Sequence, residues 1–386
     1  MKVLVVSTPL SGHLNPLLPV VEALLSRGDE VVVATGVDAA TTVENCGARF
    51  SAAGAGDGAW FERLRDRTRG NPGDGIAAER INHYFVPRLF GEIAAADMID
   101  DVLACGRDLE PDLVVFENYA LAGPLAAELL GVPGVTHLVG PMPDQEVYVL
   151  ANDAVSPLWC SFGRDVPGLA GVYRDLTIEI CPPSLEPNEV PRGEVLALRP
   201  SPLADRAATP PPRPLVYVTF GTFFNVNLDP FRVVLDALAD EPVDIVMTVG
   251  EHQDPAALSP FPPNARVERF VPQASLLPQT AVVIHHGGAG TTFGALAHGV
   301  PQVIIPQGAD NFDHAAMCTR AGNAVTILPG HVDPTTVANA VHRVLHEPGY
   351  ADAARTTAAE IEAMPGPDAV ADALRAYATT GRTNPE

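Results

Sequence analysis

Basic residues are scarce in this chain. Lys and Arg number 24 against 47 Asp and Glu, so the formal net charge is −23 over 386 residues. Nucleic acids and anionic membrane surfaces attract basic faces, and we therefore expect neither as a partner. A nucleotide can still bind to so acidic a protein, because backbone N–H groups and a few local donors can hold its phosphates.

Cysteine motifs and long apolar runs are missing as well. The five cysteines are scattered and form no C-x-x-C pair, which favours reduced thiols in a cytoplasmic protein over a disulfide framework. The apolar run that follows Met1 is too short for a signal peptide and ends in a Pro and Gly turn. No segment reaches the ~18–20 unbroken apolar residues of a membrane span. We expect a cytoplasmic protein without a membrane span, as a monomer or a homodimer.

The length and the apolar pattern predict two domains of the α/β class. The chain is too long for one ordinary core and suits two domains of ~150–200 residues each. Short apolar runs alternate with segments of helical spacing, which indicates parallel strands covered by helices. Ligands bind such doubly wound sheets outside the carboxyl ends of the strands. Two such domains that face each other would form a cleft, the expected active site.

The individual elements follow from apolar runs and from Gly and Pro signals. In the first half we expect strands at 3–6, 30–34, 113–116 and 134–139, a loop at 7–15, and helices at 16–27, 39–46 and 123–130. In the second half we expect strands at 215–220, 245–249, 282–285 and 302–306, a loop at 221–227, and helices at 230–238, 290–298 and 315–321. Residues 56–100 break this rhythm and are either a binding loop or a surface helical insertion.

A Pro-rich segment without periodicity, residues 201–214, predicts a stiff and extended linker between the domains. The N-terminal domain then covers residues 1–200, and the C-terminal domain covers 215–365. Apolar residues at helical spacing continue in the tail, residues 366–386, and predict one more helix there.

The sharpest motif is the loop at 285–292, HHGGAGTT, between an expected strand and an expected helix. Its glycines would let backbone N–H groups approach phosphate oxygens, and a helix N-terminus favours negative charge. The His side chains add donors, and the Thr hydroxyls can cap the helix. No Lys follows the glycines, so this is not a Walker loop, and adjacent His side chains diverge too far for a metal site. We predict a phosphate-binding loop; the other interpretation is a tight turn needed for packing.

The loop and its neighbours resemble the donor-binding motif of the GT-B glycosyltransferases of family 1, in the actinobacterial branch that decorates macrolides, enediynes and aromatic polyketides. The resemblance covers essentially the whole chain and is weaker at 56–100 and 140–190, where this family varies with its acceptor. The matching motifs are 270–273 (FVPQ), 285–292 (HHGGAGTT), 299–301 (GVP), Pro306, Asp310 with Asn311, 12–16 (GHLNP) and 218–222 (VTFGT).

The resemblance implies the GT-B fold, in which two doubly wound, Rossmann-like domains face each other across a cleft. The N-terminal domain would bind the acceptor, and the C-terminal domain would bind the sugar nucleotide. A final helix, residues 366–386, would return to the N-terminal domain.

The resemblance also implies donor-binding roles at the matching positions. Phe270 and Val271 would frame the nucleobase, with backbone hydrogen bonds from Val271, and Asp310 and Asn311 would bind sugar hydroxyls. The diphosphate would be held by His286, Gly288, Gly290 and Thr291, with Thr222 from the side. Gly12 and Gln273 complete the donor-binding set.

Two positions depart from the family pattern. The family usually has Asp-Gln where this chain has Asp310-Asn311, and the shorter amide suggests a sugar other than glucose, such as a deoxysugar. Relatives that use UDP-sugars often carry a Glu that binds the ribose hydroxyls, at the position of Gly294. Without this carboxylate a 2′-hydroxyl on the ribose gains no hydrogen bond, so a dTDP-sugar is favoured over a UDP-sugar.

Glycosyl transfer needs a base for the acceptor proton, and His is best suited to this task at neutral pH. His13 follows the first expected strand, at the carboxyl edge of its sheet. The resemblance implies that His13 is the base of an inverting single displacement; the other interpretation is a His that caps the next helix. A carboxylate usually orients such a His. The candidate is Glu117, one methylene longer than the family's Asp; otherwise it is a solvated loop acid.

The acceptor-binding residues are expected among the aromatic residues of the variable N-terminal regions, because large apolar acceptors stack on such rings. Each of them alone is more often a core residue. The candidates are Trp60, Tyr84, Phe85, Phe90 and Trp159. No cofactor and no metal site are expected, because no D-x-D motif opens at a suitable place and a helix dipole with His286 can stabilise the leaving group.

We therefore predict an inverting transfer of a deoxysugar from a dTDP-sugar to a hydrophobic natural product, in antibiotic or secondary-metabolite biosynthesis. One alternative is UDP-sugar-dependent transfer to a lipid or another small molecule, although no basic amphipathic patch for membrane docking is evident. A hydrolysing sugar-nucleotide 2-epimerase would need acids placed for proton abstraction at C2, and His13 fits transfer better. An auxiliary protein that binds a sugar nucleotide and activates another glycosyltransferase would need a broken base or phosphate loop, and both look intact.

Overall fold

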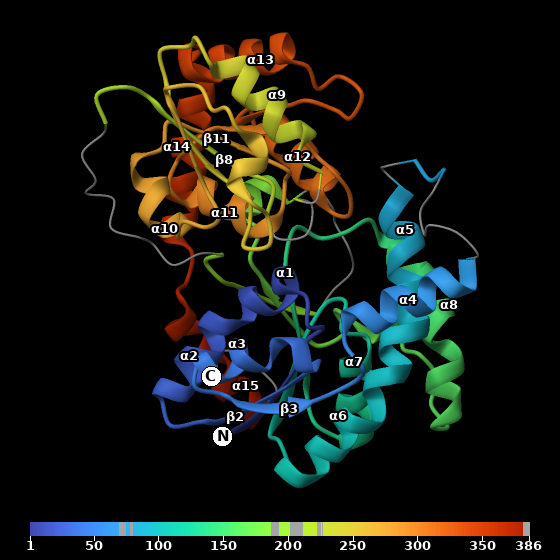
Figure 1. Ribbon diagram of the computed structural model, residues 1–386. Helices are drawn as coiled ribbons and strands as arrows, with labels where there is room; N and C mark the ends of the chain where they lie inside the picture. The colour runs from blue at the N-terminus through green and yellow to red at the C-terminus, as the bar shows by residue number, and fades with distance from the viewer. Residues whose placement is uncertain are drawn as a thin grey trace. The chain divides into compact units, whose positions relative to one another are not determined.

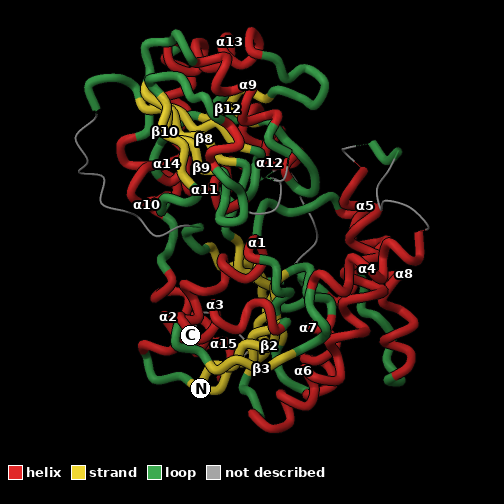
Figure 2. The backbone as a smooth tube through the Cα atoms, in the orientation of Figure 1, coloured by secondary structure: helices red, strands yellow, loops and turns green. Residues whose placement is uncertain are grey.

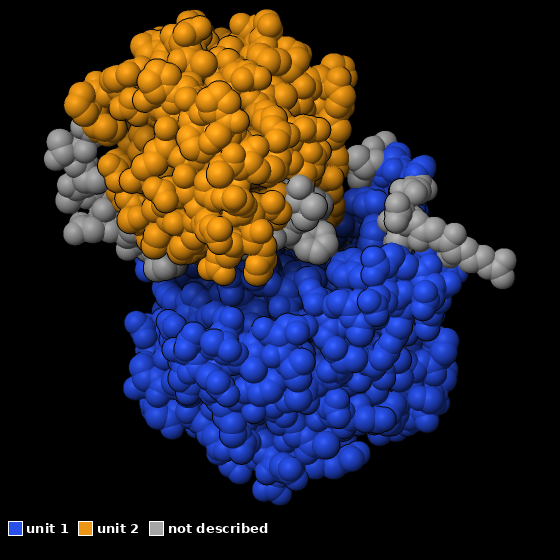
Figure 3. Space-filling view, viewed as in Figure 1, with its two compact units in different colours: residues 1–181, 187–199, 365–386 blue, residues 182–186, 200–364 orange. Residues whose placement is uncertain are grey.

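The computed structural model describes residues 1–68, 75–77, 80–186, 193–200, 211–221, 225 and 227–380. The chain divides into two compact units (Figure 3). Unit 1 comprises residues 1–181, 187–199 and 365–386, and unit 2 comprises residues 182–186 and 200–364. In each unit the strands lie in the middle and helices surround them (Figure 2). Most of the predicted linker, residues 201–210, lies outside the described residues.

Unit 1 contains, within its described residues, a parallel sheet of seven strands in the order β3-β2-β1-β4-β5-β6-β7. The strand order reverses between β1 and β4. In a doubly wound sheet a ligand crevice opens at such a reversal, outside the carboxyl ends of the two strands. The strands are β1 Lys2–Val6, β2 Glu30–Thr35, β3 Arg49–Ala52, β4 Leu113–Glu117, β5 Gly134–His137, β6 Leu176–Glu179 and β7 Glu194–Ala197.

The helices of unit 1 include one from the far end of the chain (Figure 1). Helix α15, Pro367–Thr380, packs on α2, and Arg27 at the end of α2 donates to Asp368 at 2.5 Å and to Asp372 at 2.8 Å. The others are α1 Ser11–Leu14, α2 Leu18–Ser26, α3 Ala40–Asn45, α4 Asp57–Thr68, α5 Ile81–Phe85, the π-helix η4 Val86–Ala94, α6 Ala95–Leu109, α7 Ala122–Leu130 and α8 Gln145–Ser161.

Unit 2 repeats the design with a parallel sheet in the order β10-β9-β8-β11-β12-β13. Its strand order reverses between β8 and β11. The strands are β8 Leu215–Thr219, β9 Asp244–Thr248, β10 Ala265–Glu268, β11 Val282–His285, β12 Gln302–Ile304 and β13 Ala324–Thr326. The helices are α9 Asp229–Leu238, α10 Gln273–Leu276, α11 Ala289–Ala297, α12 Asn311–Arg320, α13 Pro334–His346 and α14 Pro348–Ala363.

The central strands are apolar runs with both faces covered. Every residue of β4, β8 and β11 is buried, as are residues 3–6 of β1. Continuous apolar runs are typical of parallel strands with helices on both faces. These runs carried the sequence prediction, and the predicted α/β class with two doubly wound sheets is confirmed.

Two local predictions differ from the structure, and a third segment follows one of the two alternatives given for it. The predicted loop at 7–15 contains α1, and a 3₁₀ turn, η1 Asn15–Leu17, leads into α2. Pro16 fits in η1 because a Pro in a first helical turn loses no needed N–H donor. Residues 56–100 are largely helical, which agrees with a helical insertion rather than an irregular loop. Strands β3, β6, β7, β10 and β13 escape sequence analysis because each has only three or four residues, and all but β13 also carry a charged side chain.

None of the helices in the described part of the chain is both long enough and apolar enough to cross a membrane.

Candidate active site

Both strand reversals carry residues that the sequence singles out. In unit 1 the segment after β1 holds His13, in α1, and β4 ends at Glu117. In unit 2 the loop after β8 holds Gly221, and β11 ends at His285, where the glycine loop begins. Because β1 pairs with β4, and β8 pairs with β11, the residues that follow these strands meet at one edge of each sheet.

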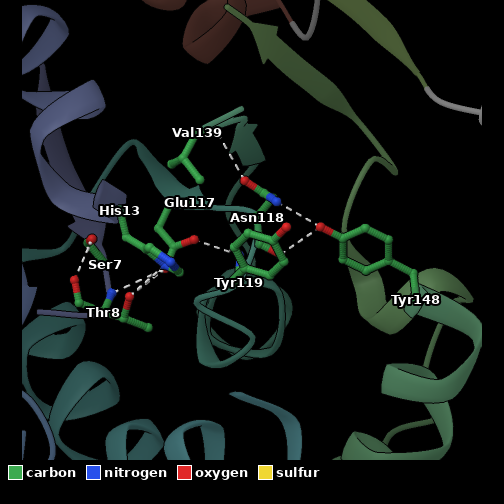
Figure 4. A network of polar contacts seen from close by, with 8 residues as sticks. All are labelled: Ser7, Thr8, His13, Glu117, Asn118, Tyr119, Val139 and Tyr148. Carbon is green, nitrogen blue, oxygen red and sulfur yellow. Dashed lines mark hydrogen bonds and ion pairs between the residues drawn. The ribbon is translucent and has the colours of Figure 1, made fainter. Parts of the chain in front are cut away.

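His13 and Glu117 lie together in unit 1 (Figure 4). Nδ1 of His13 is 3.2 Å from Oε1 of Glu117 and 2.9 Å from Oγ1 of Thr8. The side chain of His13 is 17% exposed, while that of Glu117 is fully buried. Nε2 of His13 has no hydrogen-bond partner among the described residues. It is therefore the nitrogen that can exchange a proton with a ligand.

Glu117 is held at both carboxylate oxygens. Oε2 accepts the N–H of Tyr119 at 2.6 Å, and Oε1 accepts the N–H and the hydroxyl of Thr8 at 3.3 and 3.0 Å. Burial by itself raises the pKa of this carboxyl, but the charge of His13 and the hydrogen bonds outweigh burial and lower the pKa below its usual value. Glu117 is thus an ionised partner within reach of His13, not a solvated loop acid.

Aromatic rings flank His13. The ring centroids of Phe90 and Tyr119 lie 5.3 and 5.2 Å from that of His13, and 5.4 Å from each other. Tyr148 stacks on Tyr119 at 6.4 Å and accepts a hydrogen bond from the side chain of Asn118 (Figure 4). Of the predicted acceptor residues, Phe90 is therefore the one that the structure places at the histidine.

The other aromatic candidates fall into two groups. Trp60 and Trp159 are each 1% exposed, and the indole N–H of Trp60 donates to Asp97 at 2.8 Å. Both belong to the core, which leaves them no exposed surface for the predicted acceptor contact. Tyr84 and Phe85 are half-buried and pack edge to face at 5.4 Å. They keep exposed ring surface.

Tyr84 lines a groove of about 520 Å³ along α5, η4 and α8. His83 lines the same groove, and with Asp144 and Glu146 it brings possible metal-ligand atoms within 4.8 Å of one another. Among the described residues, no other group of three or more His, Cys, Asp and Glu side chains brings its ligand atoms this close together. Arg80 already binds both oxygens of Glu146, at 2.9 and 3.1 Å. The group lies in unit 1, on other elements than the glycine loop.

In unit 2 the glycine loop leads into α11. Gly288 precedes the helix, no side chain of the described residues caps it, and its first turn holds no acidic residue. The first N–H groups therefore lack intrahelical partners, and the helix dipole makes this end positive. Gly290 is exposed, and a Cβ at this position would meet no atom within 4 Å. The turn thus presents bare backbone N–H groups.

The ring of His286 lies between two glycines. A Cβ on Gly221 would be 2.6 Å from Cε1 of His286, and a Cβ on Gly288 would be 2.4 Å from its Nε2. The ring therefore requires glycine at both positions. Burial lowers the pKa of His286 to about 4, although the charge of Asp310 opposes this shift. Near neutral pH the ring acts as a neutral hydrogen-bonding group, not as a cation.

His285 shapes the turn from inside. Its fully buried ring accepts the N–H of Gly287 at Nδ1, at 3.1 Å, and donates from Nε2 to Oε1 of Gln302 at 2.7 Å. Gly287 has a φ of +95°, which favours glycine. Burial lowers the pKa of His285 to about 3, so the ring is neutral.

The predicted nucleobase residues differ in exposure. Phe270 is 63% exposed, while Val271 packs against an apolar cluster of unit 2. Gln273 donates from Nε2 to Oγ1 of Thr291 at 2.9 Å. A Cβ at Gly294 would lie 3.6 Å from Oε1 of the same Gln273. The amide of Gln273 therefore lies where a side chain at position 294 would begin.

Asn311 is engaged within its own loop. It is 2% exposed, and its Oδ1 accepts the N–H groups of Gln307 and Gly308 at 3.3 Å each. Asn311 therefore stabilises the turn through Oδ1, while its Nδ2 donates to Oδ1 of Asp310 at 3.4 Å; its contact with a sugar stays a prediction. Asp310 is partly exposed, and its Oδ2 lies 3.8 Å from Nδ1 of the buried His314. Asp310 remains the candidate for sugar hydroxyls.

Two more predicted donor residues complete the set. Gly12 is exposed in α1, where a Cβ would meet no atom within 4 Å, and Thr222 lies outside the described residues. Sequence analysis misses Thr8, Tyr119 and His314. Thr8 and Tyr119 each stand two residues beyond the end of a central strand, so a search of all polar residues at these strand ends would find them.

Comparison with known proteins agrees with this geometry. The family described as "Erythromycin biosynthesis protein CIII-like" matches with its C-terminal domain over residues 232–377 and with its N-terminal domain over residues 81–195. The L-demethylnoviosyl transferase of Streptomyces niveus is 32% identical over 387 residues, which cover 97% of this chain and 98% of that protein.

Solved structures share the fold over the full length. The glycosyltransferase SsfS6 of Streptomyces sp. SF2575, complexed with thymidine diphosphate, has a TM-score of 0.79 at 26% identity and covers 97% of this chain and 99% of that one. The spinosyn rhamnosyltransferase SpnG, complexed with thymidine diphosphate, has a TM-score of 0.81 at 26% identity, with 97% and 100% covered. Fold and site thus define a GT-B glycosyltransferase. The chain belongs to the erythromycin biosynthesis protein CIII-like family of natural-product glycosyltransferases.

Burial of His285 predicts how stability depends on pH. Its pKa is about 3 in the folded state against 6.5 for a free group, so between these values the unfolded state binds more protons. The free energy of unfolding therefore falls as the pH drops from 6.5 towards 3. Asn at position 285 keeps an acceptor for Gly287 but does not titrate. In this window we expect His285→Asn to flatten the slope by up to about 1.4 kcal/mol per pH unit. Urea unfolding between pH 4 and 7 measures both slopes, and equal slopes would contradict the assignment.

Proposed function

We propose that this enzyme transfers a deoxysugar from a dTDP-sugar to a hydroxyl of a hydrophobic natural product, with inversion at the anomeric carbon. The observation that carries the proposal is the contact of His13 with the buried, ionised Glu117 at the strand reversal of unit 1. Unit 1 would bind the acceptor, and unit 2 would bind the sugar nucleotide at its glycine loop. The thymidine diphosphate in the complexes of SsfS6 and SpnG supports this class of donor.

His13 acts as the base through Nε2. The carboxylate of Glu117 draws the ring proton to Nδ1 and leaves a lone pair on Nε2. The acceptor hydroxyl gives its proton to Nε2 while its oxygen attacks the anomeric carbon. The bond from this carbon to the diphosphate breaks, and its electron pair leaves with dTDP. Glu117 then stabilises the imidazolium until solvent takes the proton. One displacement of this kind inverts the configuration.

The diphosphate binds at the N-terminus of α11. The unpaired N–H groups of the first turn, at Gly290 and its neighbours, donate to phosphate oxygens, and the helix dipole stabilises the charge that develops as the bond breaks. The ring of His286, fixed between Gly221 and Gly288, adds a neutral hydrogen-bonding group. We propose that these groups supply the stabilisation that a metal ion supplies in other transferases.

The donor is selected around the same helix. The exposed ring of Phe270 offers a stacking surface for thymine, and Asp310 offers a carboxylate to sugar hydroxyls. Gly294 places no carboxylate near the ribose, and the neighbouring amide of Gln273 is already bonded to Thr291. A ribose without a 2′-hydroxyl leaves no polar group unsatisfied there, which favours dTDP.

The acceptor binds near the aromatic rings of unit 1. Phe90 and Tyr119 lie next to each other and each contacts the ring of His13, and Tyr84 and Phe85 expose further ring surface. Such rings contribute apolar contact area with little loss of side-chain freedom. They fit a hydrophobic acceptor better than a strongly polar one.

Removal of the base tests the function directly. We expect His13→Ala to lower turnover with a dTDP-deoxysugar and an aromatic or macrolide acceptor by about 10²–10⁴-fold, because the acceptor proton has no other base. Binding of dTDP, measured by calorimetry, should stay as in the wild type, since His13 lies in unit 1. A variant with full turnover would show that His13 is not the base.

The diphosphate contact can be tested without disturbing the fold. Gly290→Ala adds a methyl group that meets no protein atom within 4 Å but stands where a phosphate would approach the backbone. We expect the melting temperature of the free protein to be equal to or slightly above that of the wild type, because Ala favours a helix over Gly, and the Kd for dTDP to be at least about tenfold higher. Gly58→Ala in α4, where a Cβ also meets nothing, is the matched control and should bind dTDP normally. Equal dTDP affinity in both variants argues against phosphate binding at this turn.

Position 294 should set the choice of nucleoside. In the wild type, dTDP should raise the melting temperature more than UDP does at equal concentration. Gly294→Glu supplies a carboxylate for the 2′-hydroxyl and should narrow or reverse this difference. Its Cβ lies 3.2 Å from Cδ1 of Leu277, a contact that requires only a small shift. Gly294→Ala adds the same Cβ without the carboxylate and should keep the wild-type order. A wild type that responds equally to both nucleotides would refute the preference.

A further inference from the structure

We propose that Thr8 is a positioning residue of the base: its hydroxyl links His13 to Glu117 and selects the ring tautomer that leaves Nε2 free. This inference rests on the proposed function of His13. Thr8 is fully buried, so it does not touch a substrate and acts through its two neighbours.

Three polar atoms form a closed triangle in unit 1 (Figure 4). Oγ1 of Thr8 lies 2.9 Å from Nδ1 of His13 and 3.0 Å from Oε1 of Glu117, and the third side, from Nδ1 to Oε1, measures 3.2 Å. The two sides that involve Thr8 are the shorter ones. The hydroxyl is therefore as close a partner of the imidazole as the carboxylate is.

The hydrogens in this triangle can be assigned by counting donors. The ionised Glu117 only accepts, and the hydroxyl of Thr8 has one hydrogen to give. When that hydrogen goes to Oε1, the lone pairs of Oγ1 face Nδ1, and both oxygens then accept from a protonated Nδ1. In the other tautomer, the bare Nδ1 faces the carboxylate and has to take the hydrogen that Oε1 otherwise receives. Thr8 and Glu117 together therefore favour the proton on Nδ1 and the lone pair on Nε2.

Thr8 also fixes the position of the long Glu117 side chain. Its N–H and its hydroxyl both donate to Oε1, while the N–H of Tyr119 holds Oε2. The backbone at Thr8 is itself set by the sheet, because the N–H of Ser7 continues the pairing with β2 by donating to the carbonyl of Ala34 at 3.2 Å. The carboxylate thus has one orientation, and in that orientation Oε1 meets His13.

The test compares Thr8→Val, which keeps the shape and removes the hydroxyl, with Thr8→Ser, which keeps the hydroxyl. We expect Thr8→Val to lower kcat about 10–100-fold, by analogy with the loss seen when the partner that orients a metal-binding histidine is removed. KM for the donor and the affinity for dTDP should stay unchanged. Thr8→Ser should retain kcat within about threefold. Thr8→Ala serves as a second hydroxyl-free variant if Thr8→Val folds poorly, and it should match the loss expected for Thr8→Val.

Two further measurements separate positioning from a merely structural effect. The ¹⁵N signals of His13, assigned with His13→Ala, should report a proton on Nδ1 in the wild type and in Thr8→Ser, and a mixture of tautomers in Thr8→Val. In a Glu117→Gln background Thr8→Val should add less than about threefold to the loss, because both side chains act on one ring nitrogen.

Wild-type kcat in Thr8→Val, equal losses in Thr8→Val and Thr8→Ser, or an unchanged proton on Nδ1 in Thr8→Val would each overturn the role of Thr8. These outcomes are distinct from failure of the proposed function, which shows as full turnover in His13→Ala. An inactive His13→Ala beside a fully active Thr8→Val leaves the base in place and removes only Thr8.

Discussion

The chemistry of this protein depends on the reversal of strand order at the centre of each sheet. β1 pairs with β4, and β8 pairs with β11, so the chain leaves each pair of strands in opposite directions. The polar residues after these strands meet at one edge, although His13 and Glu117 are 104 positions apart in sequence. Apolar residues fill the strands themselves, which leaves the loops beyond them free to carry the reacting groups. In the function we propose, the same backbone arrangement serves acid–base chemistry in unit 1 and anion binding in unit 2.

The candidate site places few charged side chains around its ligands, in a chain whose net charge is −23. Unit 2 offers an anion the N–H groups of α11 and a ring, His286, whose pKa of about 4 keeps it neutral. No cation has to be desolvated for this purpose, and a diphosphate bound here as proposed would meet dipoles that are already oriented. Beside His13 in unit 1 the charged group is Glu117, and three donors hold its carboxylate in place. In the proposed mechanism, the charge that appears on His13 during transfer forms beside this existing countercharge.

The sequence predicts the parts of this structure that local patterns determine. Central strands are recognisable in the sequence as apolar runs because both of their faces are buried. The glycine loop is recognisable because a turn that exposes its backbone N–H groups needs glycine. Edge strand β7 contains Glu194 and has half its surface in water, so no apolar run marks it. Residue type alone does not separate a ring in the core from a ring beside the site: Trp159 is 1% exposed, whereas Phe90, although buried too, contacts His13. Asn311 and Thr8 have partners that only the folded loop and the sheet bring near them, which no local pattern records.

The imidazole of His286, closed in by Gly221 and Gly288, has a consequence for exchanging parts between relatives. The three residues come from two separate loops, yet a Cβ at either glycine would overlap the ring. If the glycine loop with His286 is transplanted into another protein, the His286 ring fits only when the recipient has glycine at the position of Gly221, whatever nucleotide that protein binds. Chimeras of these enzymes should therefore take the loop after β8 and the start of α11 from the same parent. Recombination between these two segments would select for glycine at the positions of Gly221 and Gly288.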